Sequence, residues 1–242
     1  MDKFKFKEET NTIIVNIMGK KGSGKTYASG EIAKFLLNEG YSVYMDAFGT
    51  ELKKIVMLFF GVSKTNFDKA VNGGAVLKER IKSLYLYVHK NIGKEYEFNN
   101  VDANNHVYKD INKEIEKDLE YLNRFMQDKD VRKILQYTGT EIIRKIEPDF
   151  FTEALKHKLK KIKNGADYII ISDCRFINEY EMLNKEFKNV KNFYIKADEI
   201  DDNDKHISEI EINQIIVTYG NEIINVKNDK NKPLDIGMFK LF

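Results

Sequence analysis

The sequence is poor in several residue types that would otherwise define its class. Its 242 residues include a single cysteine, Cys174, two prolines and no tryptophan. One cysteine excludes an internal disulfide framework and an all-cysteine metal site, and it is consistent with a reducing compartment. No apolar run approaches the about 18 residues that span a bilayer, and residues 1–10 lack the apolar segment of a secretory signal. We therefore expect a soluble, cytoplasmic protein with no membrane partner.

The chain also lacks an excess of either charge. Lys and Arg number 40 and Asp and Glu number 38, so the net charge is +2. A nucleic-acid-binding protein usually carries a clear basic excess, so we expect no direct nucleic-acid binding. Hydrophobic residues make up 42% of the chain, which is enough for a core, and the length suits one large domain or a domain with an inserted lid.

Arginine is scarce among the basic residues, since only five of the 40 are arginine. Where lysine is the default cation, an arginine marks a place that needs a planar group able to form two parallel hydrogen bonds. An ordinary solvated charge is the alternative for each of the five, which are Arg80, Arg124, Arg132, Arg144 and Arg175.

The first 46 residues have the pattern of a strand, a loop, a helix and a second strand. Residues 13–18 are apolar and rich in β-branched side chains, as in a strand buried on both faces. Apolar positions at helical spacing follow over 27–38, and Gly40 suits the end of that helix. Residues 41–45 predict a second strand that ends at Asp46. This order is typical of the start of a parallel α/β sheet.

The rest of the chain continues the alternation, which predicts a parallel sheet flanked by helices in one domain over 1–242. We interpret 63–110 as an insert or lid with some helix, and 198–204 as a mobile acidic loop. The remaining patterns predict helices at 51–60, 111–127, 129–145, 149–163 and 177–187, strands at 168–172 and 192–196, and one or two short final strands at 215–218 and 222–226.

A glycine-rich segment joins the first expected strand to the first expected helix. It fits the pattern G-x-x-x-x-G-K-[S/T] in full, with the strand and the helix correctly placed around it. Its glycines let the backbone curl around one anion, and the helix presents its positive N-terminal end to the same phosphates. The lysine supplies a charge to the β- and γ-phosphates, and the threonine hydroxyl coordinates Mg²⁺. We therefore predict a P-loop NTPase-like α/β fold that binds a nucleoside triphosphate through Gly19, Lys21, Gly22, Ser23, Gly24, Lys25 and Thr26.

Two acidic residues follow expected strands. The apolar run that begins at Tyr168 ends in Asp173, and in phosphate-loop proteins such an acid lies beside the loop and holds Mg²⁺. Asp46 competes for this role, because parallel strands end at the same edge of a sheet. Arg175 would lie on the same rim and pair with a phosphate, whereas Cys174 would point the other way and pack. An exposed carboxylate without a function is the alternative for either acid.

These features favour one class of nucleotide-dependent protein. A GTPase should carry an N-K-x-D element, and the nearest string, Asn231–Asp235, has one residue too many. A motor or helicase would need a larger core and a basic channel. A small-molecule kinase needs one phosphate loop, one acid for Mg²⁺, a few cations and an acceptor pocket, so it fits this length best.

The expected helix at 129–145 carries a further motif. Residues Val131–Glu141 read V-R-K-I-L-Q-Y-T-G-T-E, which resembles the R-x-L-x-Q-x-x-G-T-[D/E] stretch of the phage (T4-type) deoxynucleoside monophosphate kinases. The resemblance runs in family order from about residue 13 to residue 229. Besides this stretch and the phosphate-loop unit it includes Asp46–Val62, Glu147–Leu155, Ser172–Glu179 and His206–Glu209.

The resemblance implies a specific activity. The γ-phosphoryl group of ATP would pass, with Mg²⁺ present, to a deoxynucleoside 5′-monophosphate (dNMP), giving ADP and the diphosphate for viral DNA synthesis in the host cytoplasm. It assigns catalysis to Lys25, Arg132, Asp173 and Arg175, and the metal to Thr26 and Asp173. Substrate binding falls on Asp46, Arg132, Gln136, Gly139, Thr140 and Phe151. The last residue replaces the Trp of the family's D-P-D-x-W element, so it would stack or pack without the indole N–H.

Several alternatives stay open. We expect Gly139 to interrupt its helix, and an ordinary C-cap is the alternative role for this glycine. For Arg132 and Arg144 the alternative is an ordinary surface charge. His206 would cap a helix, touch the adenine or be a plain surface residue. An ATP-dependent switch protein that orders 63–110 and a kinase of another small metabolite are rival functions, and a homodimer is an open possibility.

Overall fold

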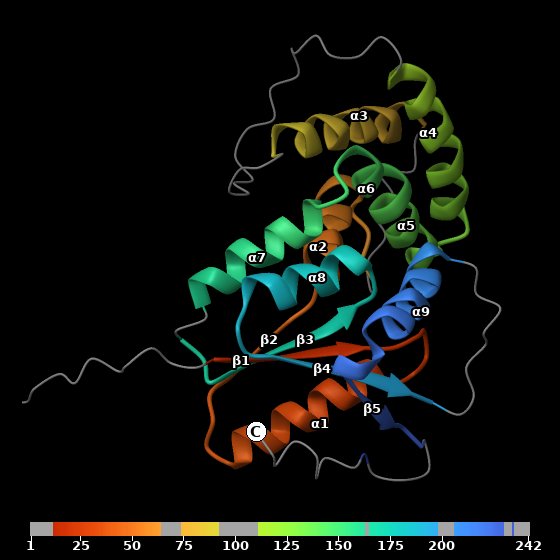
Figure 1. Ribbon diagram of the computed structural model, residues 1–242. Helices are drawn as coiled ribbons and strands as arrows, with labels where there is room; N and C mark the ends of the chain where they lie inside the picture. The colour runs from red at the N-terminus through yellow and green to blue at the C-terminus, as the bar shows by residue number, and fades with distance from the viewer. Residues whose placement is uncertain are drawn as a thin grey trace, which may run out of the picture. The chain divides into compact units, whose positions relative to one another are not determined.

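The computed structural model describes residues 12–63, 74–91, 111–162, 165–197, 206–229 and 234. They belong to two compact units, shown in Figure 1. The sheet unit comprises the chain up to Phe48 and from Leu155 onward, and the helical unit comprises Gly49–Ala154. Most of the expected lid, the acidic loop 198–204 and nearly all of the string 231–235 lie outside the described residues.

The sheet unit is built on five parallel strands in the order β2-β3-β1-β4-β5. The prediction of a parallel sheet flanked by helices is therefore confirmed. The strands are β1 (Ile13–Met18), β2 (Val43–Asp46), β3 (Tyr168–Cys174), β4 (Val190–Lys196) and β5 (Ile223–Lys227).

Alternation of apolar side chains along β1 gives the sheet two buried faces. Ile14 and Met18 pack on one face with α8 (Ile177–Glu186), α9 (Ile207–Tyr219) and the last part of α7 (Phe150–Ile162). Val15 and Ile17 pack on the other face with α1 (Lys25–Asn38). Figure 1 shows α1 on one side of the sheet and the other three helices on the opposite side. This arrangement fixes the loop between β1 and α1 at the carboxyl edge of the sheet.

One expected strand is a helix. Ile, Val and Thr favour extended backbone, and their run at 215–218 predicts a strand, but these residues lie inside α9 (Ile207–Tyr219). Ser208, Glu209, Ile212 and Ile215 are the buried positions of this helix, at helical spacing, whereas Val217 is 86% exposed. The prediction at 215–218 is therefore wrong, because burial on one helical face outweighs the β propensity of a short run. The second expected strand of this pair, at 222–226, is present as β5.

The helical unit has its own apolar core, to which every one of its helices contributes. The core is rich in aromatic rings, for example Tyr87, which lies 5.5 Å from Phe59 and 6.2 Å from Phe150. The helices are α2 (Gly49–Phe60), α3 (Gly74–Lys90), α4 (Ile111–Gln127), α5 (Val131–Tyr137), the π-helix η2 (Thr138–Ile143), α6 (Arg144–Ile146) and the start of α7.

The backbone stays helical from Val131 to Ile146, so the expected interruption at Gly139 is wrong. Instead, the turn at Thr138–Ile143 widens to a π-helix. A Cβ added to Gly139 would lie 2.8 Å from Cδ2 of Leu52 on α2. Glycine is present at this position because two helices approach closely there, and it does not cap a helix end.

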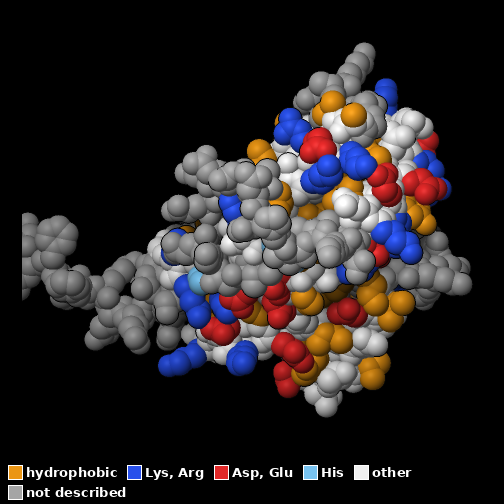
Figure 2. Space-filling view, turned by 90° about the horizontal axis from the view of Figure 1, so that it is seen from above, with side chains coloured by type: hydrophobic (Ala, Val, Ile, Leu, Met, Phe, Trp, Pro, Cys, Tyr) orange, Lys and Arg blue, Asp and Glu red, His pale blue; other side chains and the backbone are white. Residues whose placement is uncertain are grey.

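The surface carries charges of both signs, as the net charge of +2 suggests. On the described part of the face in Figure 2, Lys and Arg side chains alternate with Asp and Glu. Within the residues described, no helix is both long and apolar enough to cross a membrane.

Candidate active site

The glycine-rich loop connects β1 to α1, as the sequence predicts. Gly24 has a φ of 88°, a left-handed conformation that favours glycine. A Cβ at this position would also overlap Nδ2 of Asn228, which donates a hydrogen bond to the Ser23 carbonyl at 2.9 Å. A Cβ at Gly19 would lie 2.7 Å from the Ile195 carbonyl oxygen. Close approach by neighbouring backbone and side chains therefore requires glycine at both positions.

The Lys25 side chain is buried inside this loop. Its Nζ donates hydrogen bonds to the carbonyl oxygens of Gly19 and Lys20, each at 2.6 Å, and the residue is 7% exposed. These bonds satisfy a buried ammonium that would otherwise be costly. The loop therefore holds a positive charge at a fixed place at the start of α1.

The N-terminus of α1 adds further groups that suit an anion. Gly24 is the N-cap, no side chain caps the helix, and its first turn contains no acidic residue. The first amides of a helix have no partner within the helix, and together with the helix dipole they bind anions well. Ser23 Oγ is buried without a hydrogen-bond partner in the described structure, and Thr26 is exposed in the first turn. This combination of an ammonium, helix amides and hydroxyls fits a phosphate chain.

The strand order separates the two candidate metal acids. Asp173 lies in β3, directly beside β1, and the β1–β3 register pairs its neighbour Cys174 with Met18, the last residue before the loop. Asp173 is half-buried, and its Oδ1 accepts a hydrogen bond from the Phe48 amide at 2.7 Å. Cys174 is fully buried in the core, which confirms the expected packing role.

Asp46 lies on β2, one strand further from the loop, and it is committed to local contacts. Its carboxylate pairs with Lys158 Nζ at 2.5 Å and accepts hydrogen bonds from the Tyr44 hydroxyl and the Ala47 amide. Burial opposes the charge of Lys158, but the bonds to Asp46 and Tyr44 prevail and raise the pKa of the ammonium above its usual value. Of the two acids, Asp173 has the position that better suits a metal beside the loop.

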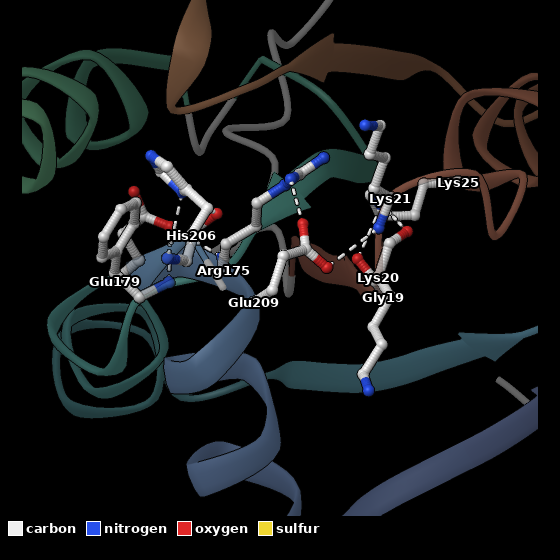
Figure 3. Close-up of polar contacts among 10 residues, drawn as sticks. Gly19, Lys20, Lys21, Lys25, Arg175, Glu179, His206 and Glu209 are labelled. Carbon is white, nitrogen blue, oxygen red and sulfur yellow. Dashed lines mark hydrogen bonds and ion pairs between the residues drawn. The ribbon is translucent and has the colours of Figure 1, made fainter. Parts of the chain in front are cut away.

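Arg175 lies beyond the end of β3 and is held by acids from two helices. Glu179 Oε2 accepts hydrogen bonds from the Arg175 amide at 2.8 Å and the Phe176 amide at 3.1 Å. Arg175 Nη1 pairs with Glu209 Oε1 at 2.8 Å, and Glu209 Oε2 accepts a hydrogen bond from the Lys21 amide at 3.1 Å. Figure 3 shows Glu209 between the phosphate loop and Arg175. The rim of acid and cation is thus connected to the loop through one carboxylate.

Sequence reasoning missed three residues at this site. Glu179 and Glu209 are the last residues of two segments that carry the family resemblance, so their position in those motifs was an available signal. Asn228 follows β5 as an ordinary polar residue, and its contact with Ser23 joins residues 205 positions apart, which no local pattern reveals.

Within the helical unit, four of the expected substrate residues lie on one stretch of helix, namely Arg132, Gln136, Gly139 and Thr140. Asp130 caps α5 by accepting a hydrogen bond from the Lys133 amide at 3.0 Å, and Arg132 is exposed in the first turn. Gln136 and Thr140 are half-buried, and because the helix continues through Gly139 they are not separated by a chain break. These side chains therefore lie on one continuous helical segment.

Phe151 is packed in the core of the helical unit. It is 3% exposed, its ring lies 5.3 Å from that of Phe150, and the Arg144 guanidinium lies 5.1 Å above it. Arg144 also donates a hydrogen bond to the Pro148 carbonyl at 3.2 Å. Arg144 therefore has a structural role next to Phe151, and of the two roles expected for Phe151, packing is the one seen here.

The described histidines and acids do not form a metal centre by themselves. His206 is the N-cap of α9, where its Nδ1 accepts a hydrogen bond from the Ser208 amide at 3.3 Å, which confirms the capping alternative. Among the described residues, no group of three or more His, Cys, Asp or Glu side chains could hold a metal ion.

Comparison with known proteins agrees with this geometry. A search of the curated proteins finds no match. A family model described as deoxynucleotide monophosphate kinase matches residues 13–231, which include the loop, Asp173, Arg175 and the helix from Val131 to Ile146. The match covers well over half of the chain, so it agrees with the resemblance in the motifs. The chain therefore belongs to the deoxynucleotide monophosphate kinase family and is a kinase.

Proposed function

We propose that this protein transfers the γ-phosphoryl group of ATP to a deoxynucleoside 5′-monophosphate and releases ADP and the deoxynucleoside diphosphate. The observation that carries the proposal is the phosphate loop, with its buried Lys25 and the uncapped N-terminus of α1. Family membership supports the nucleotide acceptor. The product is the precursor that a virus needs for DNA synthesis in the host cytoplasm.

On the donor side, the triphosphate is bound by the loop residues Gly19–Thr26. Lys25 exchanges its bonds to the loop carbonyls for phosphate oxygens, which places its charge against the leaving and transferred groups. Arg175 neutralises negative charge that develops on the transferred group. Removal of such a fixed charge from the transition state typically costs about 10²–10³ in rate.

Thr26 and Asp173 are the residues that hold Mg²⁺ in this proposal. Their fit rests on the exposed hydroxyl in the first turn of α1 and on the carboxylate of the strand beside β1. When bound, Mg²⁺ neutralises phosphate charge and orients the phosphate chain.

On the acceptor side, we assign the dNMP to the helical unit. Arg132 is an exposed cation whose planar group suits a monophosphate, and Gln136 and Thr140 offer an amide and a hydroxyl to the nucleoside. Gly139 keeps the helix close to α2, and Phe151 packs in the core of the same unit. These roles come from the positions that match the family motif.

A coupled assay with ATP, Mg²⁺ and each of the four common dNMPs tests the activity through ADP release. We expect at least one dNMP to stimulate release well above the rate with ATP alone. No stimulation by any of them would reject the dNMP kinase.

Thermal unfolding with each ligand separates the rival functions. A ligand that binds only the native state raises stability by mass action. We expect a saturating dNMP to raise Tm in addition to the rise with ATP and Mg²⁺. A rise with ATP alone would instead favour the ATP-dependent switch, and a kinase of another metabolite would bind ATP but no dNMP.

A further inference from the structure

The Glu209 carboxylate joins three parts of the sheet unit that are far apart in sequence. It projects from the first turn of α9, accepts a hydrogen bond from the Lys21 amide in the phosphate loop and pairs with Arg175 beyond β3. Figure 3 shows its two oxygens directed at these two partners. Each oxygen therefore has a different task, one on the loop and one on the cation.

The burial of Glu209 indicates that these contacts matter. Its side chain is only 7% exposed, and a buried carboxylate is costly unless it is paired and hydrogen-bonded. A glutamate at the third position of a helix ordinarily accepts a hydrogen bond from the N-cap amide, as Glu179 does at the start of α8. The equivalent residue of α9 directs both oxygens to tertiary partners instead. Local helix capping therefore does not account for this side chain.

Among the residues that the structure describes, the Arg175 guanidinium has an acid on one edge. Glu209 contacts Nη1, and the described residues place no second acid within ion-pair distance of the guanidinium. A guanidinium has five N–H donors in a planar fork, so a single contact leaves donors for another anion. The Arg175 side chain is 26% exposed, so it is not enclosed in the core.

The positive charge of the phosphate loop explains why a carboxylate is needed between the loop and Arg175. Lys20, Lys21 and Lys25 all belong to the loop motif, and like charges would repel the Arg175 guanidinium. A carboxylate that is bonded both to the loop backbone and to the guanidinium offsets this repulsion. It also sets the distance between the two.

We propose that Glu209 is a positioning residue that holds Arg175 against the phosphate loop, so that the guanidinium meets the transferred phosphoryl group. This inference rests on the proposed function, since it assigns the anion that Arg175 contacts. Glu209 acts through Arg175 and does not touch the substrates.

The kinetic test compares Glu209→Gln with Glu211→Gln. Glu211 lies on the same helix and accepts a hydrogen bond from the Ile177 amide at 2.9 Å, so it is a matched control that acts on backbone alone. A catalytic group that is misplaced by about 1 Å can lower the reaction rate by up to about 10²-fold. We therefore expect Glu209→Gln, which loosens the position of Arg175, to lower kcat about tenfold. The KM values for ATP and dNMP should change much less, and Glu211→Gln should keep kcat close to wild type. A rise in KM for ATP at unchanged kcat would overturn the proposal.

A double-mutant cycle with Arg175→Ala tests whether Glu209 acts through Arg175. If it does, Glu209→Gln will lower kcat no further in the Arg175→Ala background, because coupled residues are not additive. If kcat of the double mutant instead falls by the product of the two single effects, the two residues act independently. That result would overturn the proposal and leave Glu209 a structural role.

A labelling experiment decides the question without any activity. Phenylglyoxal modifies accessible arginines, and peptide mass spectrometry follows Arg175 with the exposed Arg124 as internal reference. We expect Arg175 to react several-fold faster in Glu209→Gln than in the wild type or Glu211→Gln. Equal rates of Arg175 modification in Glu209→Gln and the wild type would overturn the inference. If the wild type released no ADP in response to a dNMP, only the proposed function would be rejected. If Glu209→Gln does not fold, Glu209→Asp, which is too short to keep both contacts, should show the same direction.

Discussion

The buried charged groups at the phosphate loop of the sheet unit and the buried acid Asp118 of the helical unit are held in different ways. In the sheet unit, Lys25 and Glu209 are bonded to backbone atoms of the phosphate loop. In the helical unit, the buried Asp118 accepts hydrogen bonds from the side chains of Tyr85 and Tyr137, at 2.8 and 2.9 Å, inside an aromatic core. A group bonded to backbone has its position set by the path of the chain. A group bonded to side chains has its position set by packing.

The glycines show the same contrast. Gly24 in the sheet unit needs a left-handed backbone and room beside Asn228, whereas Gly139 in the helical unit is helical and needs only room beside Leu52. We therefore expect substitutions at the loop to lower turnover with little change in acceptor affinity or stability. Substitutions in the helical unit should act on acceptor affinity and on stability.

The largest effect is expected from Lys25→Ala. The change removes a fixed charge from the phosphate loop, so kcat should fall by about 10²–10³. Lys34→Ala is the control on the same helix, because Lys34 is exposed and pairs only with Glu31 at the surface, a contact worth little. Steady-state kinetics with circular dichroism measures both; a wild-type rate in folded Lys25→Ala would remove this lysine from the mechanism.

A smaller and different effect is expected from Arg132→Ala in the helical unit. If Arg132 binds the acceptor monophosphate, KM for dNMP should rise about tenfold, equivalent to about 1.4 kcal/mol, while KM for ATP stays unchanged. Arg132→Lys should recover only part of the loss, because it keeps the charge but not the fork. Lys133→Ala, the exposed neighbour on α5, should leave both KM values close to wild type. Equal rises in both KM values for Arg132→Ala would contradict the assignment of the dNMP to the helical unit and of ATP to the sheet unit.

The glycine contrast can be tested by stability alone. Gly139→Ala places a methyl group 2.8 Å from Cδ2 of Leu52, and overpacking of about 1–3 kcal/mol should exceed the about 1 kcal/mol gained in helix propensity. Gly30→Ala in α1 meets nothing within 4 Å, so it should be neutral or stabilising.

Urea unfolding of these two variants gives the comparison, and Leu52→Ala provides a further check. In the Gly139→Ala background this truncation should cost less than it does in the wild type, because it relieves the overlap. A Gly139→Ala protein as stable as Gly30→Ala would show that Leu52 moves freely and that this close approach is unimportant.

The smallest effect is a pH dependence at Asp118. Burial raises the pKa of this carboxyl above its ordinary value, in spite of the hydrogen bonds from Tyr85 and Tyr137. Because the pKa is higher in the folded state, the contribution of the acid to stability is full below about pH 4, its unfolded pKa, and is lost as the pH rises through the folded value. Relative to Asp118→Asn, which does not titrate, the wild type should therefore lose stability as the pH rises from about 4.

Urea unfolding at several pH values measures this difference. Asp128→Asn, which changes an exposed acid directly after α4, is the control. Parallel stability curves for Asp118→Asn and the wild type would mean that the tyrosine hydroxyls compensate fully for burial.

Strong local patterns made much of the fold predictable. The strand at 13–18 and the helix at 111–127 have the bounds that periodicity assigns to them. The phosphate loop is equally local, because its glycines, lysine and helix start occupy one short stretch. Two predictions were wrong where tertiary contacts oppose local preference: the β-branched residues 215–218 pack as helix, and Gly139 continues a helix against Leu52.

The sequence by itself determined the loop, the alternation of strands and helices and the resemblance to the family, since each depends on residues close together or in fixed order. Only the tertiary structure decided that Asp173 lies next to β1 while Asp46 pairs with Lys158 one strand away. It alone joined Glu209 to Lys21 across 188 positions of the chain. The physical reason is that burial forces a charged group to find partners wherever the fold brings them, and no short-range pattern records that choice.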